Sequence, residues 1–227
     1  MSYLKRFSVT GSVCPSSPVF GQRAAREVSR LAPGFDQVVV AGIGSGVVAS
    51  RIYQHHPDAI LFECEREFAN RFHQRHPSAR VVTDFIQSLY EHHPELSDKR
   101  VLLASFIPTA GAFYSDEIAR FFTGLCRNGG YVMQMRYLPH RMSARFFDGM
   151  QDRGVMSERL FTVARNLPPV SMFGMRSTLT SMPGGHRATE TDKTVAVPAF
   201  PRQKEATPAA SQPEVEEAAA RIALVRS

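Results

Sequence analysis

The sequence predicts an α/β fold, with a doubly wound, mostly parallel sheet and an antiparallel pair of strands at one edge. Two observations predict it. Short apolar runs alternate with segments whose apolar residues recur at helical spacing, which is typical of parallel strands covered by helices. Two further β-like runs are joined by Asn166-Leu167-Pro168-Pro169, where the double proline interrupts strand pairing and sets a turn.

Each element follows from this alternation in chain order. Ser16 or Ser17 caps a helix that begins near Val19, and Gly129-Gly130 ends the predicted helix 115–126. The predicted strands are 38–41, 59–62, 80–82, 101–104 and 131–135, followed by the antiparallel pair 160–164 and 170–175, and the other predicted helices are 47–55, 66–75, 85–91 and 115–126.

The chain has 227 residues, of which 43% are hydrophobic, so we expect one domain and a tail. The predicted divisions are an N-terminal segment 1–17, a domain 18–180, and a largely disordered tail 181–227 with a short helix at 214–225. No apolar run approaches the ~20 residues of a membrane-spanning helix, and no signal-peptide pattern is present. We therefore expect a cytoplasmic protein.

Cysteine and histidine usage predicts no metal site. Cys14, Cys64 and Cys126 form no Cys-x-x-Cys pair, and the pairs His55-His56 and His92-His93 fall at the ends of predicted helices, where imidazole suits the helix dipole.

The formal net charge is +6, and two stretches contain basic residues without acidic ones. This pattern indicates an anionic partner, either phosphate groups or a membrane surface, although ordinary solubilising charge also accounts for it. The first stretch contains Lys5, Arg6, Arg23 and Arg26, and the second contains Arg120, Arg127, Arg136, Arg141 and Arg145.

A glycine-rich turn follows the first strand, at the edge where doubly wound sheets bind their ligands. It reads Gly42-Ile43-Gly44-Ser45-Gly46, and alternating glycines let the backbone approach a ligand closely. Glu63 ends the second strand about 20 residues later, where a carboxylate can bind ribose hydroxyls, and Asp84 follows the third strand, where an adenine would lie. Acidic residues there also cap helices.

The spacing Gly-x-Gly-x-Gly favours S-adenosylmethionine over a dinucleotide, since no pyrophosphate has to be held at the helix N-terminus. The predicted cofactor-binding residues are Ser16, Ser17, Gly42, Ile43, Gly44, Ser45, Gly46, Glu63, Cys64, Asp84, Phe85 and Ser105.

Four segments in order resemble one protein family: Thr10 to Ser17, Leu61-Phe62-Glu63 with Arg66 to Ala69, Gly129 to Tyr137, and Arg165 to Pro169. Across about residues 8–177 the chain resembles bacterial phospholipid N-methyltransferases, which are relatives of the ribosomal RNA adenine dimethyltransferases. The resemblance implies the Rossmann-like fold of class I methyltransferases, with residues 1–17 covering the cofactor.

The chain also departs from the family pattern. This chain has Ala41 where the family has an acidic residue and Arg136 where the family has a threonine. The family's usual Ser-Gly-Leu-Pro segment is Ser105-Phe106-Ile107-Pro108 in this chain. We expect these changes to affect which methyl acceptor the protein binds more than which class of cofactor it binds.

The leading functional prediction is N-methylation of an amine such as the headgroup of phosphatidylethanolamine, or of a small-molecule amine. Ser105, Tyr114 and Tyr137 are the candidate catalytic residues, because an amine must lose a proton. The basic N-terminus predicts peripheral contact with the inner membrane surface.

Two alternatives stay open. One is a small-molecule biosynthetic enzyme that transfers the methyl group or cleaves or cyclises the cofactor's aminocarboxypropyl arm. The other is an RNA-modifying or nucleic-acid-binding relative, although the loop after the fourth strand lacks the Asn-x-x-aromatic pattern that binds a flipped base, so we do not expect a nucleic acid partner.

Overall fold

A computed structural model of the chain describes residues 16–109, 116–138, 143–166 and 168–178. The chain divides into the units Met1–Gly185 and His186–Ser227, and every described residue belongs to the first. Residues 1–15 of the predicted N-terminal segment and the whole predicted tail 181–227, with its helix, lie outside the described residues.

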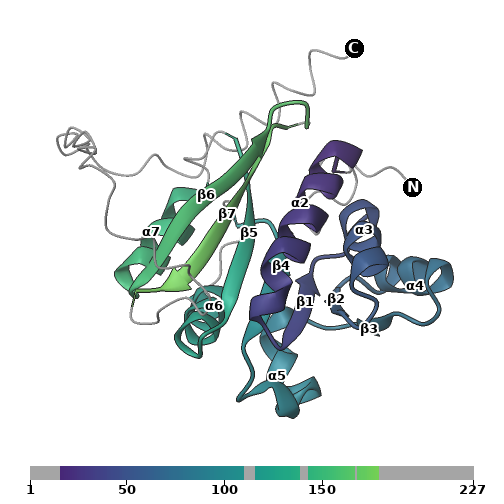
Figure 1. Ribbon diagram of the computed structural model, residues 1–227, viewed down its shortest axis with the longest axis horizontal. Helices are drawn as coiled ribbons and strands as arrows, with labels where there is room; N and C mark the ends of the chain where they lie inside the picture. Colours follow the sequence, from purple (N-terminus) through teal and green to yellow (C-terminus); the bar gives the residue numbers. More distant parts are fainter. Residues whose placement is uncertain (1–15, 110–115, 139–142, 167, 179–227) are drawn as a thin grey trace, which may run out of the picture. The chain divides into compact units, whose positions relative to one another are not determined.

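The sheet has seven strands in the order β3-β2-β1-β4-β5-β7-β6 (Figure 1). The first five of these pair in parallel, whereas β7 pairs antiparallel with both β5 and β6. This confirms the predicted mostly parallel sheet with an antiparallel edge pair. The strands are β1 (Gln37–Ala41), β2 (Ile60–Phe62), β3 (Arg80–Val82), β4 (Val101–Ser105), β5 (Tyr131–Tyr137), β6 (Val155–Val163) and β7 (Val170–Ser177).

The helices alternate with the strands, as predicted. In the first helix, Ser17 caps the start and Pro18 occupies the first turn, where its missing N–H costs nothing. The α-helices are α2 (Pro18–Leu31), α3 (Val47–His55), α4 (Arg66–Arg75), α5 (Leu89–His92), α6 (Asp116–Arg127) and α7 (Ala144–Asp152), and short 3₁₀ helices are η2 (Ala32–Gly34), η3 (Ile86–Ser88) and η4 (Pro94–Leu96).

Strand side chains alternate between two apolar clusters, one on each face of the sheet. Side chains of α2, α3 and α4 pack on one face, and those of α5, α6 and α7 pack on the other (Figure 1). Fully buried members are Phe20, Ile52 and Phe72 on the first face and Leu89, Phe122 and Phe146 on the second.

The structure differs from the sequence prediction in three elements. Helix α7 was not predicted; Gly149 lies inside it, and Ser143 at its N-cap makes no capping hydrogen bond, so its sequence signal is weak. Strand β6 begins five residues before the predicted 160–164, because residues 156–159 are exposed on the sheet edge and show no apolar alternation. The predicted helix 85–91 is a 3₁₀ turn followed by the one-turn helix α5.

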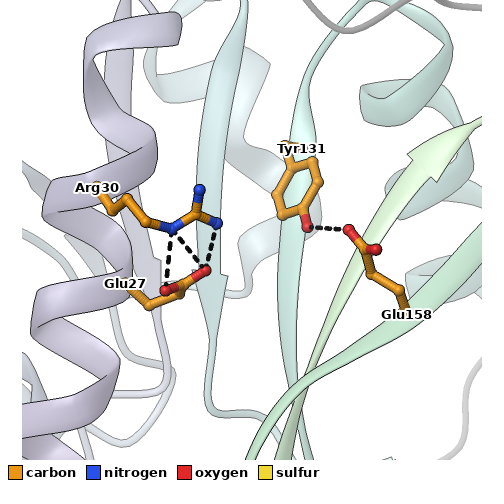
Figure 2. A network of polar contacts seen from close by, with 4 residues as sticks. All are labelled: Glu27, Arg30, Tyr131 and Glu158. Carbon is orange, nitrogen blue, oxygen red and sulfur yellow. Dashed lines mark hydrogen bonds and ion pairs between the residues drawn. The ribbon is translucent and has the colours of Figure 1, made fainter. Parts of the chain in front are cut away.

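Two polar pairs brace the part of the sheet around Tyr131, the first residue of β5 (Figure 2). On α2, the Arg30 guanidinium donates to the Glu27 carboxylate, with Nη2 to Oε1 at 2.6 Å. The Tyr131 hydroxyl donates to Glu158 Oε1 of β6 at 3.4 Å, and burial raises the pKa of Tyr131. Gly174 leaves the space that the Tyr131 hydroxyl occupies, since a Cβ there would collide with it.

The strand order reverses between β1 and β4, so the carboxyl edge beside these two strands is the expected ligand site. Among the described residues, no helix is both long enough and apolar enough to cross a membrane.

Candidate active site at the carboxyl edge of the sheet

The loop between β1 and α3 has a backbone that demands glycine. Gly42, Gly44 and Gly46 have φ angles of +84°, +52° and +83°. Residues with a Cβ rarely adopt such angles, whereas glycine adopts them at little cost. The three glycines that the sequence singled out are therefore conformational requirements of the loop.

Glu63 follows β2 and holds this loop. Its Oε2 accepts a hydrogen bond from the Gly44 amide at 2.8 Å, and its Oε1 accepts one from the Glu65 amide at 2.9 Å. The side chain is buried, with 7% of the residue exposed. Oε2 has a second lone pair and can still accept a hydrogen bond from a ligand hydroxyl, whereas Oε1 also accepts a weak hydrogen bond from the Cys64 thiol. The structure thus brings the predicted acid and the glycine loop together.

Cys64 lies beside this carboxylate, with its Sγ 3.8 Å from Glu63 Oε1. The residue as a whole is exposed, yet partial burial of the thiol and the neighbouring Glu63 charge raise the pKa of Cys64 to about 11. The thiol is therefore protonated at neutral pH and is a poor nucleophile.

Asp84 and Phe85 follow β3 at the same edge of the sheet. Asp84 Oδ2 lies 2.9 Å from His92 Nε2, and Asp84 Oδ1 accepts from the Phe85 amide at 2.7 Å. These hydrogen bonds, that of His92 foremost, lower the pKa of Asp84. The Phe85 ring is 64% exposed, which is unusual for a large apolar side chain and leaves an aromatic face for a planar ligand.

The segment after β4 packs directly against the glycine loop. The Phe106 amide donates to Ala41 O at 2.8 Å, and a Cβ on Gly42 would lie 3.2 Å from the Phe106 carbonyl carbon and 3.3 Å from Ile107 N. Ser105 ends β4 with no exposed surface, and its Oγ has no hydrogen-bond partner. This residue was predicted both as a cofactor ligand and as a catalytic group.

Gln134 was quoted in the family resemblance but not predicted as a site residue. It is the β5 partner of Ser105 in the sheet register and is fully buried. Its Nε2 donates to Ile107 O at 2.8 Å and to Met135 O at 2.7 Å, whereas its Oε1 has no partner. A glutamine in the middle of an apolar strand was the sequence signal that identifies it.

The structure does not place the other two catalytic candidates, Tyr137 and Tyr114, beside Ser105 and Gln134. Tyr137 ends β5 and packs on the cluster that α2 covers, whereas Ser105 and Gln134, by strand alternation, face the helices α6 and α7. Tyr114 lies outside the described residues.

Arg136 lies on the same face as Gln134, two residues further along β5. Its Nε donates to Ser143 Oγ at 2.8 Å, and its guanidinium lies 4.2 Å from the centre of the Phe147 ring. Burial lowers the pKa of Arg136. Arg136 therefore places a partly buried cationic group on the strand that carries Gln134.

The predicted N-terminal cover is described only at Ser16 and Ser17. Ser17 Oγ accepts a hydrogen bond from the Phe20 amide at 3.2 Å, as predicted for a helix cap, and the Ser17 amide donates to Asn166 Oδ1 at 2.8 Å. Within the described ranges, no three His, Cys, Asp or Glu side chains gather into a group that could hold a metal ion.

Comparisons with known proteins give a fold but no close relative. No protein-family model matches the chain, and no curated protein matches it significantly. Among solved structures, a protein described as a candidate RNA methyltransferase from Pyrococcus horikoshii aligns with a TM-score of 0.52 and 12% identity, over 71% of this chain and 83% of that one. The fold is that of class I methyltransferases.

A second solved structure, DesVI of Streptomyces venezuelae, aligns with a TM-score of 0.50 and 11% identity over 70% of this chain and 91% of that chain. The predicted fold class is thereby confirmed. At such identities the likeness extends to the fold, and the acceptor has to be argued from the site itself.

Proposed function

We propose that this chain is an S-adenosylmethionine-dependent methyltransferase that acts on an amine nitrogen. The observation that carries the proposal is the loop of three left-handed glycines whose Gly44 amide is bound by the buried carboxylate of Glu63. A Cβ at any of these glycines would require a strained backbone, so the loop is built for close approach of a ligand. The comparison with the Pyrococcus protein supports the same reaction class.

Residues at the carboxyl edge of the sheet match the amino acid, ribose and adenine portions of S-adenosylmethionine. The glycine loop would lie against its amino acid portion, Glu63 would accept hydrogen bonds from the ribose hydroxyls, and the exposed Phe85 ring beside Asp84 would stack on the adenine. When bound, S-adenosylmethionine supplies an activated methyl group on a sulfonium sulfur. Backbone and side-chain contacts are proposed from Ser16, Ser17, Gly42, Ile43, Gly44, Ser45, Gly46, Glu63, Cys64, Asp84, Phe85 and Ser105.

Two buried acceptors support a nitrogen nucleophile. Ser105 Oγ and Gln134 Oε1 come from paired residues of neighbouring strands, and neither has a partner. Gln134 cannot turn its oxygen toward Ile107 without placing it against a carbonyl oxygen, so Oε1 is a fixed acceptor. Both atoms are enclosed by protein, so we propose that the residues covering them move when the acceptor binds; an amine with two N–H groups then satisfies both atoms, whereas a hydroxyl brings only one hydrogen.

In the proposed reaction the acceptor nitrogen would use its lone pair to take the methyl group that the bound cofactor supplies, and the sulfur would keep the electrons of the bond that breaks. The chain's share is to hold the nitrogen in line, exclude water and accept hydrogen bonds from its N–H groups at Ser105 and Gln134. The proton of the product amine leaves to solvent.

The headgroup of a phosphatidylethanolamine-type phospholipid is the proposed acceptor. The resemblance in four ordered segments supports it, and the exposed Arg26 of α2 would favour an anionic surface. RNA is the second candidate, because the Pyrococcus protein is described as acting on RNA and the same basic charge would attract its phosphates.

One experiment separates these acceptors. The purified chain is incubated with S-adenosylmethionine carrying a labelled methyl group and, in separate reactions, with anionic vesicles containing phosphatidylethanolamine, with total RNA, with phosphoethanolamine, or with no acceptor. We expect label in the lipid. Label in RNA or in phosphoethanolamine would show that this compound, and not the lipid, is the methyl acceptor. Methylthioadenosine formed without any acceptor would indicate cleavage of the aminocarboxypropyl arm instead. A matched Gly44→Val protein is the control and should be inactive in every arm.

A further inference from the structure

The side chain of Asn166 joins two segments that lie at opposite ends of the described chain. Its Oδ1 accepts a hydrogen bond from the Ser17 amide at 2.8 Å, and its Nδ2 donates to Pro168 O at 2.7 Å. The residue is 2% exposed, so these bonds are shielded from water. Both ends of the amide are thus used, which fixes its orientation.

The turn that carries Asn166 is held firmly. It connects the end of β6 to β7, and the Leu138 amide after β5 donates to Pro169 O at 2.9 Å. Proline at 168 and 169 restricts the backbone further. Asn166 is therefore presented to Ser17 from a rigid support.

The start of α2 faces the candidate cofactor site from the other side. A Cβ on Gly21 would lie 3.4 Å from Val47 O, in the first turn after the glycine loop. The Phe20 ring packs edge-on against Phe106 of the segment after β4, with centroids 6.1 Å apart. In Figure 1, α2 lies beside α3 with its N-terminal end toward the β6–β7 turn. The first turn of α2 therefore lies against the first turn of α3, which follows the glycine loop, and against the segment after β4.

We propose that Asn166 is a positioning residue that clamps the start of α2 beside the cofactor site through the Ser17 amide. Cofactor affinity then depends on the turn between β6 and β7, whose Asn166 side chain is occupied by Ser17 and Pro168. The effect on affinity rests on the proposed function, whereas the clamp itself does not. It also explains why two of the four segments that resemble the methyltransferase family, around Ser17 and around Asn166, occur together: they contact each other.

Substitution at Ser17 removes the hydrogen bond from its donor side. The φ of −66° at Ser17 suits proline, so Ser17→Pro deletes the N–H without straining this backbone angle, but its ring carbon replaces the amide hydrogen and meets Asn166 Oδ1 unless that side chain is also shortened. Ser17→Ala is the matched control, because both variants lose the capping hydroxyl but only the proline loses the N–H. Isothermal titration with S-adenosylhomocysteine is expected to give a Kd about tenfold weaker for Ser17→Pro than for Ser17→Ala.

Two further readouts distinguish positioning from general loss of structure. Asn166→Ala should also weaken the Kd about tenfold, and adding Ser17→Pro to it should change the Kd by less than about twofold, because both changes break the same bond and no side-chain oxygen then meets the proline ring. Hydrogen exchange at the Gly21 amide, which donates to Ser17 O, should be about tenfold faster in Ser17→Pro than in Ser17→Ala.

Equal Kd values and equal exchange for the two Ser17 variants would overturn the clamp, as would additive effects in the double variant. If the wild-type chain binds no S-adenosylhomocysteine, the proposed function fails, and the Gly21 exchange still decides whether the clamp exists.

Discussion

Replacing Ser105 with alanine distinguishes a catalytic hydroxyl from a structural one, because the two roles predict opposite changes in stability. A buried hydroxyl without a partner costs the folded state about 1–3 kcal/mol, and Ser105 Oγ is such a group. Deleting one oxygen also removes a few dispersion contacts of about 0.1–0.2 kcal/mol each. We therefore expect Ser105→Ala to be more stable by about 1 kcal/mol, which corresponds to a thermal midpoint about 2–4 °C higher.

The same variant should lose activity. Without the hydroxyl, the acceptor nitrogen loses one of its two hydrogen-bond acceptors, and we expect kcat/KM for methyl transfer to phosphatidylethanolamine vesicles to fall about 10²-fold. Calorimetric unfolding and a labelled-methyl assay on the same preparation measure both quantities.

Ser171→Ala is the matched control, since Ser171 is equally buried but its Oγ lies 2.8 Å from Thr162 Oγ1. This control should lose stability and keep its activity. A Ser105→Ala protein that melts earlier than wild type and transfers methyl groups at the wild-type rate would refute the reasoning, because its hydroxyl would then serve the fold.

Two further predictions concern stability. Gly174→Ala should lower the thermal midpoint by several degrees, since the added Cβ collides with the Tyr131 hydroxyl. Adding Tyr131→Phe should restore part of the lost stability. A Gly174→Ala protein as stable as wild type would contradict this prediction. Because its hydrogen bonds lower the pKa of Asp84 in the folded state, Asp84 contributes stability that is present above its ordinary pKa of about 3.9 and is lost as the pH falls through the lowered value. Urea unfolding at pH 6 and pH 3 should therefore show a smaller loss for Asp84→Asn than for wild type, and equal losses would argue against the His92 and Phe85 bonds.

Much of the fold follows from local pattern. Helices α3 and α4 begin and end at the predicted residues, and β3 does likewise, because their apolar periodicity is bounded by glycine, proline or a change of polarity. The antiparallel edge pair was predictable from the double proline of its turn. Helix α7 was not, since its interior glycine and absent cap give no local signal, and it forms because Phe146 and Met150 bury against the sheet.

The candidate site also contains residues that the sequence predicts and residues that it does not. Gly42, Gly44, Gly46 and Glu63 follow strands at predictable positions, so topology alone brings them together. Asn166 and Ser17 meet across 149 residues of sequence, and no local pattern in one segment contains the other. Such contacts depend on tertiary packing, which a single sequence does not display.

Calorimetric titration of the folded chain with S-adenosylmethionine and S-adenosylhomocysteine tests the central claim most directly. We predict measurable heat for both compounds in wild type and none in Gly44→Val, where a β-branched side chain cannot adopt the φ of +52° that places its amide on Glu63. Absence of heat for both compounds with wild-type protein, or unchanged binding by a folded Gly44→Val protein, would contradict the assignment of this loop to the cofactor.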